Sequence, residues 1–321
     1  MADTPPTAQP VSPHIGTAPR PAHGSVTTGI ALMVAFTVFA PGIDVFAKLA
    51  AQDQPPGQVA AARFAVQFLL LLPVMISRGA FSGMPPGVFG LHLVRGVLIG
   101  IATVCFMTAL KYMPIADAIA IFFVEPMFLT ILGGLLLGEQ VGWRRYLACA
   151  VGFVGAMIVV QPSFDELGWI AALPLGTAMS FAFYLVLTRH MTAREDPLAM
   201  QGFAGLFGAV FVGAVLWFGA GSGSSVFDPE WPDMNGWLLL LCVGVMATIS
   251  HIFLVFAFRN APASVLAPLQ YIEIVVATIL GYLVFGDFPD ALKWLGIAII
   301  VGSGLFIIWR ERAAGKRAAG A

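Results

Sequence analysis

The chain has 321 residues, of which 59% are hydrophobic and only 10% carry a charged side chain. Soluble domains carry about 25% charged residues, so this composition and a mean hydropathy of +0.90 predict an all-α protein that crosses the membrane several times. The formal net charge of −1 argues against a nucleic-acid role. Cys105, Cys149 and Cys242 fall within apolar runs and are interpreted as small core residues, with neither disulfide nor metal-ligand spacing.

The two ends of the chain are polar. Residues 1–25 are rich in proline and lack the basic start and short apolar stretch of a signal peptide, so we expect a disordered cytoplasmic tail there. A basic cytoplasmic tail is expected at 312–321.

Ten apolar runs approach the length of about 20 residues that a spanning helix needs. The links between them are short and marked by proline, glycine and charge. The predicted spans are Thr28–Ala47, Val59–Ile76, Val88–Leu110, Ile115–Leu137, Trp143–Gln161, Trp169–Thr188, Leu198–Phe218, Gly236–Phe258, Ser264–Phe285 and Ala291–Trp309.

Basic residues predict the orientation of these spans. If the N-terminus is cytoplasmic, the cytoplasmic segments hold eleven lysines and arginines and the outer links hold three. This bias follows the positive-inside rule. It predicts a multi-pass protein of the cytoplasmic membrane with both termini inside, and an even number of spans is consistent with that.

The fourth run carries a glutamate in its middle. Glu125 lies ten residues after Ile115, about 15 Å at 1.5 Å per residue, which is half of a hydrocarbon core of about 30 Å. A carboxylate at that depth costs about 2.5 kcal/mol or more, so it needs a partner, a proton or a wet cavity. Pro126 follows it, lacks an N–H and clashes with the carbonyl of Phe122, which predicts a kink.

The same pattern returns near the C-terminus, in Ser264–Asp287. Glu273 lies 148 positions after Glu125, and the same offset joins further pairs of matching residues: Ala109 and Ala257, Pro114 and Pro262, Thr130 and Thr278, Gly133 and Gly281, Gly138 and Gly286. Pro268 precedes the second glutamate, so both helices are expected to be broken, by different devices.

This duplication predicts two repeats of five helices each, at 26–162 and 163–311. Five is odd, so the second repeat enters the membrane from the opposite side. Inverted repeats of this kind are common in secondary transporters, whose substrate sites lie near the midplane between the repeats. The prediction therefore places Glu125 and Glu273 on facing helices at similar depth.

Several of these motifs resemble the EamA-type branch of the drug/metabolite transporter superfamily. The residues that carry the resemblance are Glu125-Pro126, Leu137-Gly138-Glu139, Pro268, Glu273, Gly286-Asp287, the stretch 106–116 and Ala62-Arg63-Phe64. The resemblance implies ten helices, a central cavity and transport of a small organic metabolite. The segment 271–312 resembles the sub-branch of riboflavin and S-adenosylmethionine carriers. The second copy departs from the pattern because it lacks the Glu-Pro dipeptide and ends in Gly-Asp.

Glu125 and Glu273 are the leading candidates for the site, as proton-coupling carboxylates or as counter-charges for the substrate. The alternative is a structural hydrogen bond that holds a kinked helix. Arg63 is a candidate to pair with Glu125 or Asp44 or to bind an anionic group, against the alternative that it snorkels to the outer headgroups.

Two further charged positions have simpler explanations. Asp44 and Lys48 have the spacing of an (i, i+4) ion pair at the outer rim, and Arg95 is expected to snorkel towards the inner surface.

Four more residues are candidates for lining the site. His251 is a lone histidine on an apolar helix, and core packing is the alternative for it. Gln270 and Tyr271 precede Glu273 closely. Phe122 is a candidate to stack on a flat ring, although aromatic residues at helical spacing more often serve packing.

The leading hypothesis is a secondary carrier that moves a small metabolite by alternating access. Riboflavin is the first specific substrate; the alternatives are S-adenosylmethionine, another cationic metabolite, or an amine or amino acid that is exported. Glu125→Gln is expected to inactivate transport by a cation carrier, whereas a carrier of a neutral ring is expected to tolerate it at high pH.

Other classes of protein have less support. The sequence contains no P-loop and no catalytic or metal-ligating pattern, so no enzyme activity, cofactor or metal is predicted. An intramembrane enzyme or a channel is the alternative of a different class, and a homodimer is left open.

Overall fold

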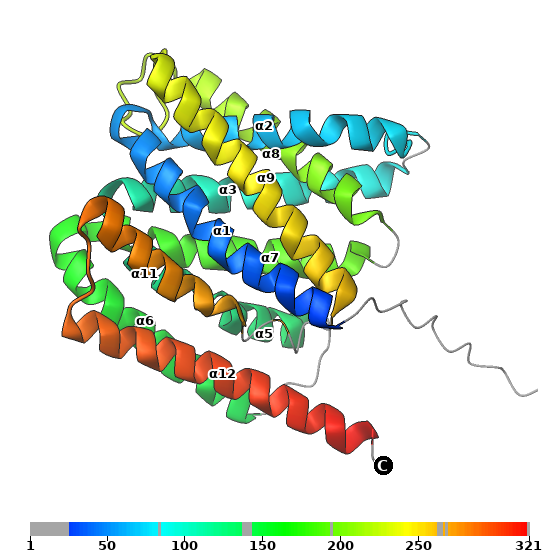
Figure 1. The fold of residues 1–321 in the computed structure, drawn as a ribbon, viewed down its shortest axis with the longest axis vertical. Coiled ribbons are helices and arrows are strands. Elements are labelled where there is room, and N and C mark those ends of the chain that lie inside the picture. The colour runs from blue at the N-terminus through cyan, green and yellow to red at the C-terminus, as the bar shows by residue number, and fades with distance from the viewer. Residues whose placement is uncertain are drawn as a thin grey trace, which may run out of the picture.

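The computed structural model describes residues 26–82, 85–136, 143–192, 195–261, 266 and 269–319, and these form a helical bundle without strands (Figure 1). The predicted tail at 1–25 and Ser264 lie outside the described residues. The helices are α1 (Val26–Asp53), α2 (Pro56–Ser77), α3 (Pro86–Tyr112), α4 (Ile115–Phe122), α5 (Glu125–Leu136), α6 (Trp143–Leu167), the 3₁₀ helix η1 (Gly168–Ala172), α7 (Leu173–Thr192), α8 (Pro197–Gly219), α9 (Met234–Asn260), α11 (Ile272–Phe285) and α12 (Ala291–Ala319).

Local sequence signals fix where several helices begin. Proline opens α2, α3 and α8, where its missing N–H costs nothing and its fixed φ suits the first turn. Asp196 caps α8, since its Oδ1 accepts hydrogen bonds from the backbone N–H groups of Leu198 and Ala199 at 3.1 and 3.0 Å. Asp233 caps α9 in the same way through Gly236.

In the part of the chain that the structure describes, six helices are long and apolar enough to cross a membrane, and shorter apolar helical stretches accompany them. The six are Val26–Asp53, Pro56–Ser77, Pro86–Tyr112, Asp165–Thr188, Pro197–Gly219 and Met234–Ala257; the shorter ones are Tyr146–Val159, Ile272–Phe285 and Ala291–Phe306. Many of their large apolar side chains are exposed, such as Leu69 and Val210. Lipid is the solvent that tolerates such a surface, and the chain is a multi-pass membrane protein.

Helical backbone extends beyond two of the predicted spans. α6 continues to Leu167 and passes through η1 into α7, where a link was expected. α12 continues to Ala319, into the predicted basic tail at 312–321.

Helices from the first half of the chain pack on helices from the second half. α1 lies along α9, α2 along α8, α3 along α7 and α8, and α6 along α12. Figure 1 shows α6 and α12 side by side at one edge of the bundle, with α1 and α9 on the opposite side of α11. α4 contacts α11 in the interior, so the two predicted core helices are neighbours.

Both of these helices are broken, the first where Pro126 predicts it and the second three residues after Pro268, which itself lies outside the described residues. The fourth span is two helices, α4 and α5, separated by a turn at Phe123 and Val124 just before Pro126. In the ninth span a turn at Tyr271 precedes α11. Phe123 and Tyr271 are 148 positions apart, and their rings contact each other with centroids 5.2 Å apart. Residues at the same position in the two predicted repeats therefore meet in the core.

Glycine allows α3 and α8 to approach closely. A Cβ atom at Gly96 would lie 2.2 Å from the Cβ of Phe207 and 2.9 Å from its backbone carbonyl carbon. Gly96→Ala is therefore expected to destabilise the protein by about 1–3 kcal/mol, because the backbones must separate. The melting temperature of the purified protein measures this. Gly90→Ala, on the same helix, meets nothing within 4 Å and should melt like the unsubstituted protein; equal melting temperatures for both variants would contradict the packing.

Candidate functional site

The first group of polar residues lies at the helix breaks. Glu125 begins α5 with 8% of its surface exposed, and its Oε1 has no hydrogen-bond partner among the described residues. Tyr271 is equally buried, and its hydroxyl also lacks a partner in the described part of the chain. The two groups lie within electrostatic range of each other. Buried polar groups normally have partners, so these two groups together are a candidate site for a bound proton or ligand.

The Tyr271 hydroxyl is held close to α12. A Cβ atom at Gly304 would lie 1.5 Å from it, so only glycine fits there. This contact brings α12 to the break before α11, and it leaves the tyrosine ring between Phe123 and Gly304.

The second group surrounds Arg63 on α2. The Arg63 side chain is buried, so the snorkelling alternative for it was wrong. It donates hydrogen bonds to Thr103 Oγ1 at 3.0 Å and to His251 Nε2 at 3.5 Å. His251 Nδ1 lies 2.8 Å from the carbonyl of Ala247, which favours the tautomer with hydrogen on Nδ1 and leaves Nε2 free to accept from Arg63. Thr103 and His251 are themselves 148 positions apart.

Two carboxylates accompany this group. Asp44 on α1 is buried and lies within electrostatic range of both Arg63 and Glu273, which is half-buried on α11. Glu273 therefore neighbours Asp44, whereas Glu125 neighbours Tyr271. Of the remaining candidates, Gln270 is half-buried in helical backbone directly before the turn at Tyr271.

A chain of aromatic rings starts from the breaks. Phe122 contacts Phe123, Phe106 and Phe181, with centroids 5.9, 5.9 and 5.6 Å away. Phe181 in turn stacks on Tyr184 at 5.4 Å with an interplanar angle of 28°. We call these residues, from Tyr271 through Phe123, Phe122 and Phe181 to Tyr184, with Phe106 at the side, the aromatic chain.

Arg95 ends the aromatic chain, and the prediction that it snorkels was wrong. Its side chain is 1% exposed, and its guanidinium carbon lies 4.8 Å from the centroid of the Tyr184 ring. It donates hydrogen bonds to Tyr184 Oη at 3.1 Å and to Thr188 Oγ1 at 3.0 Å on α7, and to the carbonyl of Met200 on α8 at 3.3 Å. The position of Arg95 along the predicted span did not predict these contacts, because the depth of a side chain does not reveal which neighbours it faces.

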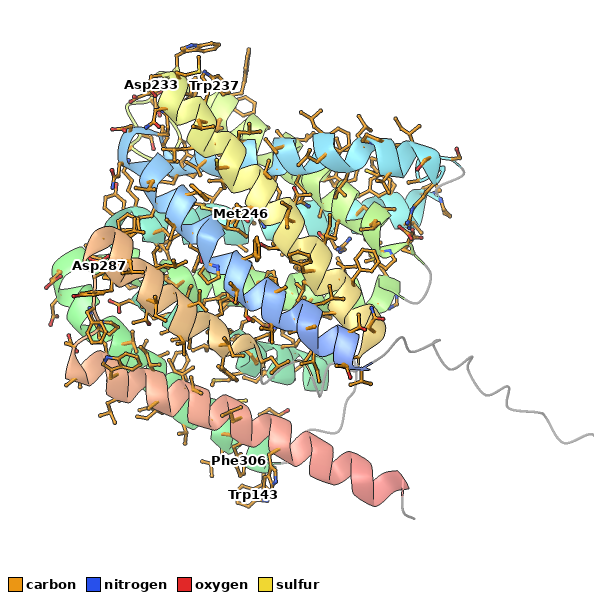
Figure 2. The ribbon with its side chains drawn as sticks, in the orientation of Figure 1. Trp143, Asp233, Trp237, Met246, Asp287 and Phe306 are labelled. Carbon is orange, nitrogen blue, oxygen red and sulfur yellow. The ribbon has the colours of Figure 1, made fainter. Side chains whose placement is uncertain are left out.

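Two ion pairs join the halves of the chain at one end of the bundle. Lys48 on α1 lies 2.8 Å from Asp287 and also donates to the carbonyl of Met113 at 3.1 Å, so the predicted pair of Asp44 with Lys48 was wrong. Lys293 on α12 lies 2.6 Å from Asp117 on α4, whose side chain is fully buried. Figure 2 shows Asp287 in the link between α11 and α12, far from Trp143 at the start of α6 and from Phe306 in the second half of α12.

Histidine, cysteine and acidic side chains are the candidate metal ligands of this bundle. Across the ranges that the structure describes, no group of three histidine, cysteine or acidic residues is placed to hold a metal ion. No disulfide joins Cys105, Cys149 and Cys242, all of which lie in the described ranges. What the geometry offers is a buried polar core with donors, acceptors and flat rings at the breaks of two helices.

One protein-family description matches most of the chain. The description "EamA-like transporter family" matches residues 27–161 and again residues 168–309. The chain belongs to the EamA-like transporter family. It is 32% identical over 267 residues to a riboflavin transporter of Vibrio cholerae, covering 82% of this chain and 86% of the relative. It is 27% identical over 292 residues to an S-adenosylmethionine uptake transporter of Rickettsia felis, covering 90% and 95%.

A solved structure shares the fold of this EamA-like transporter. A crystal structure aligns with a TM-score of 0.59 and 19% sequence identity, covering 87% of this chain and 95% of the solved one. Family membership makes the protein a carrier of small metabolites across a membrane.

Proposed function

We propose that this transporter carries riboflavin, or a metabolite with a similar flat ring, across the cytoplasmic membrane by alternating access. The observation that carries the proposal is the aromatic chain, which runs from the helix breaks at Tyr271 and Phe123 to Arg95. Flat rings stack on aromatic side chains, and the donors at its end suit a ring with carbonyl groups. The identity with a riboflavin transporter supports the same substrate.

The architecture behind the proposal is ten spans in two inverted repeats, at 26–162 and 163–311. α4 and α5 together form the fourth span and η1 with α7 forms the sixth. In this arrangement α1 corresponds to α7, α2 to α8, α3 to α9 and α5 to α11. The pair α1 and α9 then corresponds to α7 and α3, the pair α1 and α11 to α7 and α5, and the pair α2 and α9 to α8 and α3. All of these pairs pack together. This symmetry of the helix pairs supports the proposal of two inverted repeats. The basic residues favour cytoplasmic termini.

Glu125, Glu273, Arg63, His251, Gln270, Tyr271 and Phe122 are the residues that we propose for binding and coupling. Glu125 carries the coupled proton, because it is buried beside Tyr271 without a cationic partner among the described residues. Arg63 and His251 lie between the halves and orient the substrate. Phe122 supplies the central ring of the aromatic chain.

Uptake into proteoliposomes tests the substrate. Vesicles that contain the purified protein are expected to accumulate labelled riboflavin, and to do so more strongly with a pH gradient, while labelled S-adenosylmethionine stays at the level of protein-free vesicles. Accumulation of S-adenosylmethionine alone would favour the cation carrier, and equal counts in protein-free vesicles for both compounds would contradict the proposal.

The ion pair of Lys48 with Asp287 gives the alternating-access mechanism a second test. The pair joins the first half to the second at one end and is partly buried, with 14% and 29% of the side chains exposed, so it stabilises the conformation closed at that end. Asp287→Lys should lower riboflavin uptake about tenfold, equivalent to about 1.4 kcal/mol of bias between conformations. Adding Lys48→Asp restores the pair and should recover most of the uptake; a double variant as slow as the single one would contradict this role.

A further inference from the structure

Arg95 carries a charge that the described residues do not neutralise. Its bonds go to two hydroxyl groups and one backbone carbonyl, and in the described part of the chain no carboxylate forms an ion pair with it. A guanidinium group has five N–H donors, so donors remain beyond those three bonds. The side chain is 1% exposed, so bulk water does not serve as the partner of the remaining N–H donors.

Structure alone does not explain an arginine in this place. The three bonds tie α3 to α7 and α8, but a neutral amide would meet the same neutral acceptors without a buried charge, which is expensive inside a membrane. Arginine has the advantage only if a group rich in acceptors, neutral or anionic, is also bound there.

Tyr184 adds a second donor at the same point. Its hydroxyl oxygen accepts from Arg95, and its hydroxyl hydrogen has no acceptor within the ranges that the structure describes. The same tyrosine lies within electrostatic range of Arg63. One guanidinium group and a phenol therefore lie at one end of the aromatic chain, with the Arg63 guanidinium within electrostatic range, and they repel a cation and attract hydrogen-bond acceptors.

We propose that Arg95 and Tyr184 bind the carbonyl edge of the flat ring of the substrate and so select an acceptor-rich ring over a cationic metabolite. This inference rests on the proposed function and names the residues that decide its specificity. The riboflavin ring carries two carbonyl oxygens along one edge, on either side of an N–H group, and both oxygens accept hydrogen bonds. S-adenosylmethionine carries a sulfonium cation, which both arginines disfavour.

Binding to the full-length protein in lipid nanodiscs tests this role, with quenching of flavin fluorescence as the readout. Riboflavin and lumiflavin are the two probes, because lumiflavin keeps the ring and lacks the ribityl chain. Arg95→Gln should weaken the binding of both probes by the same factor, about tenfold or more, the loss expected for hydrogen bonds from a charged group. Tyr184→Phe, which keeps the ring and removes only the hydroxyl, should weaken both about fivefold.

Arg78→Gln is the matched control, since Arg78 pairs with Asp196 in an exposed position outside this group; it should bind both flavins like the unsubstituted protein. Unchanged binding in Arg95→Gln and Tyr184→Phe would overturn the inference while the proposed function stands. Weaker binding of riboflavin but not of lumiflavin in Arg95→Gln would also overturn it, since Arg95 would then contact the ribityl chain. If Arg95→Gln does not fold, Tyr184→Phe decides. Failure of the unsubstituted protein to bind either flavin would overturn the proposed function as well.

Discussion

Replacing Glu125 by glutamine is expected to abolish riboflavin accumulation driven by a pH gradient and to leave the exchange of riboflavin across the membrane intact. Glutamine has nearly the shape of a protonated glutamate but cannot release a proton. Glu125 is buried, and its Oε1 has no partner in the described ranges, so the amide fits without breaking an ion pair. A carrier that must deprotonate to complete an empty return step then stops, whereas exchange of bound substrate requires no proton transfer.

The measurement compares gradient-driven uptake with counterflow in the same proteoliposomes. Accumulation should fall to the level of protein-free vesicles, while counterflow stays within about twofold of the unsubstituted protein, a difference of about 0.4 kcal/mol. Glu166→Gln, an exposed glutamate at the end of α6, is the control and should behave normally in both assays. Gradient-driven accumulation that survives Glu125→Gln would exclude Glu125 as the coupling residue.

Lys293→Met is expected to give the largest loss of stability. Lys293 lies 2.6 Å from Asp117 Oδ2, and the Asp117 side chain is fully buried between α4 and α12. Removing one partner of a buried ion pair leaves an uncompensated charge and costs about 3–5 kcal/mol. Because Lys293 keeps 17% exposure, we expect about 2–3 kcal/mol here, seen as a lower melting temperature of the purified protein.

The double variant Lys293→Met with Asp117→Asn separates this charge effect from loss of packing. Asparagine removes the buried charge, so the double variant should be more stable than Lys293→Met alone. If the second substitution lowers the melting temperature further by the amount that Asp117→Asn causes alone, the two residues do not interact and the buried pair does not exist.

Features that are local in sequence were predictable. The helix break before Pro126 follows from the missing N–H of proline, and it appears between Phe122 and Glu125. Pro268 predicted a second break; it lies outside the described residues, and a turn appears three residues later, at Tyr271. Hydropathy identified the apolar helices because lipid requires long apolar segments.

Features that depend on long-range packing were not predictable in the same way. The (i, i+4) rule favoured Asp44 as the partner of Lys48, but α1 packs on α11 and brings Asp287 within 2.8 Å. Depth suggested snorkelling for Arg95, but the rotation of α3 turns it towards Tyr184. Asp117 was overlooked, although an acidic residue within an apolar run was a signal that it has a partner.

Protection of a cysteine at position 122 tests the central claim most directly, namely that a flat substrate binds on the aromatic chain between the two halves. In a variant without Cys105, Cys149 and Cys242, Phe122→Cys is labelled with a small thiol reagent in membranes, and Glu166→Cys, at the exposed end of α6, is the control. Riboflavin is expected to slow labelling at position 122 and S-adenosylmethionine is not, with neither changing labelling at position 166. Labelling at position 122 that saturating riboflavin leaves unchanged, in protein that still transports riboflavin, would contradict the account.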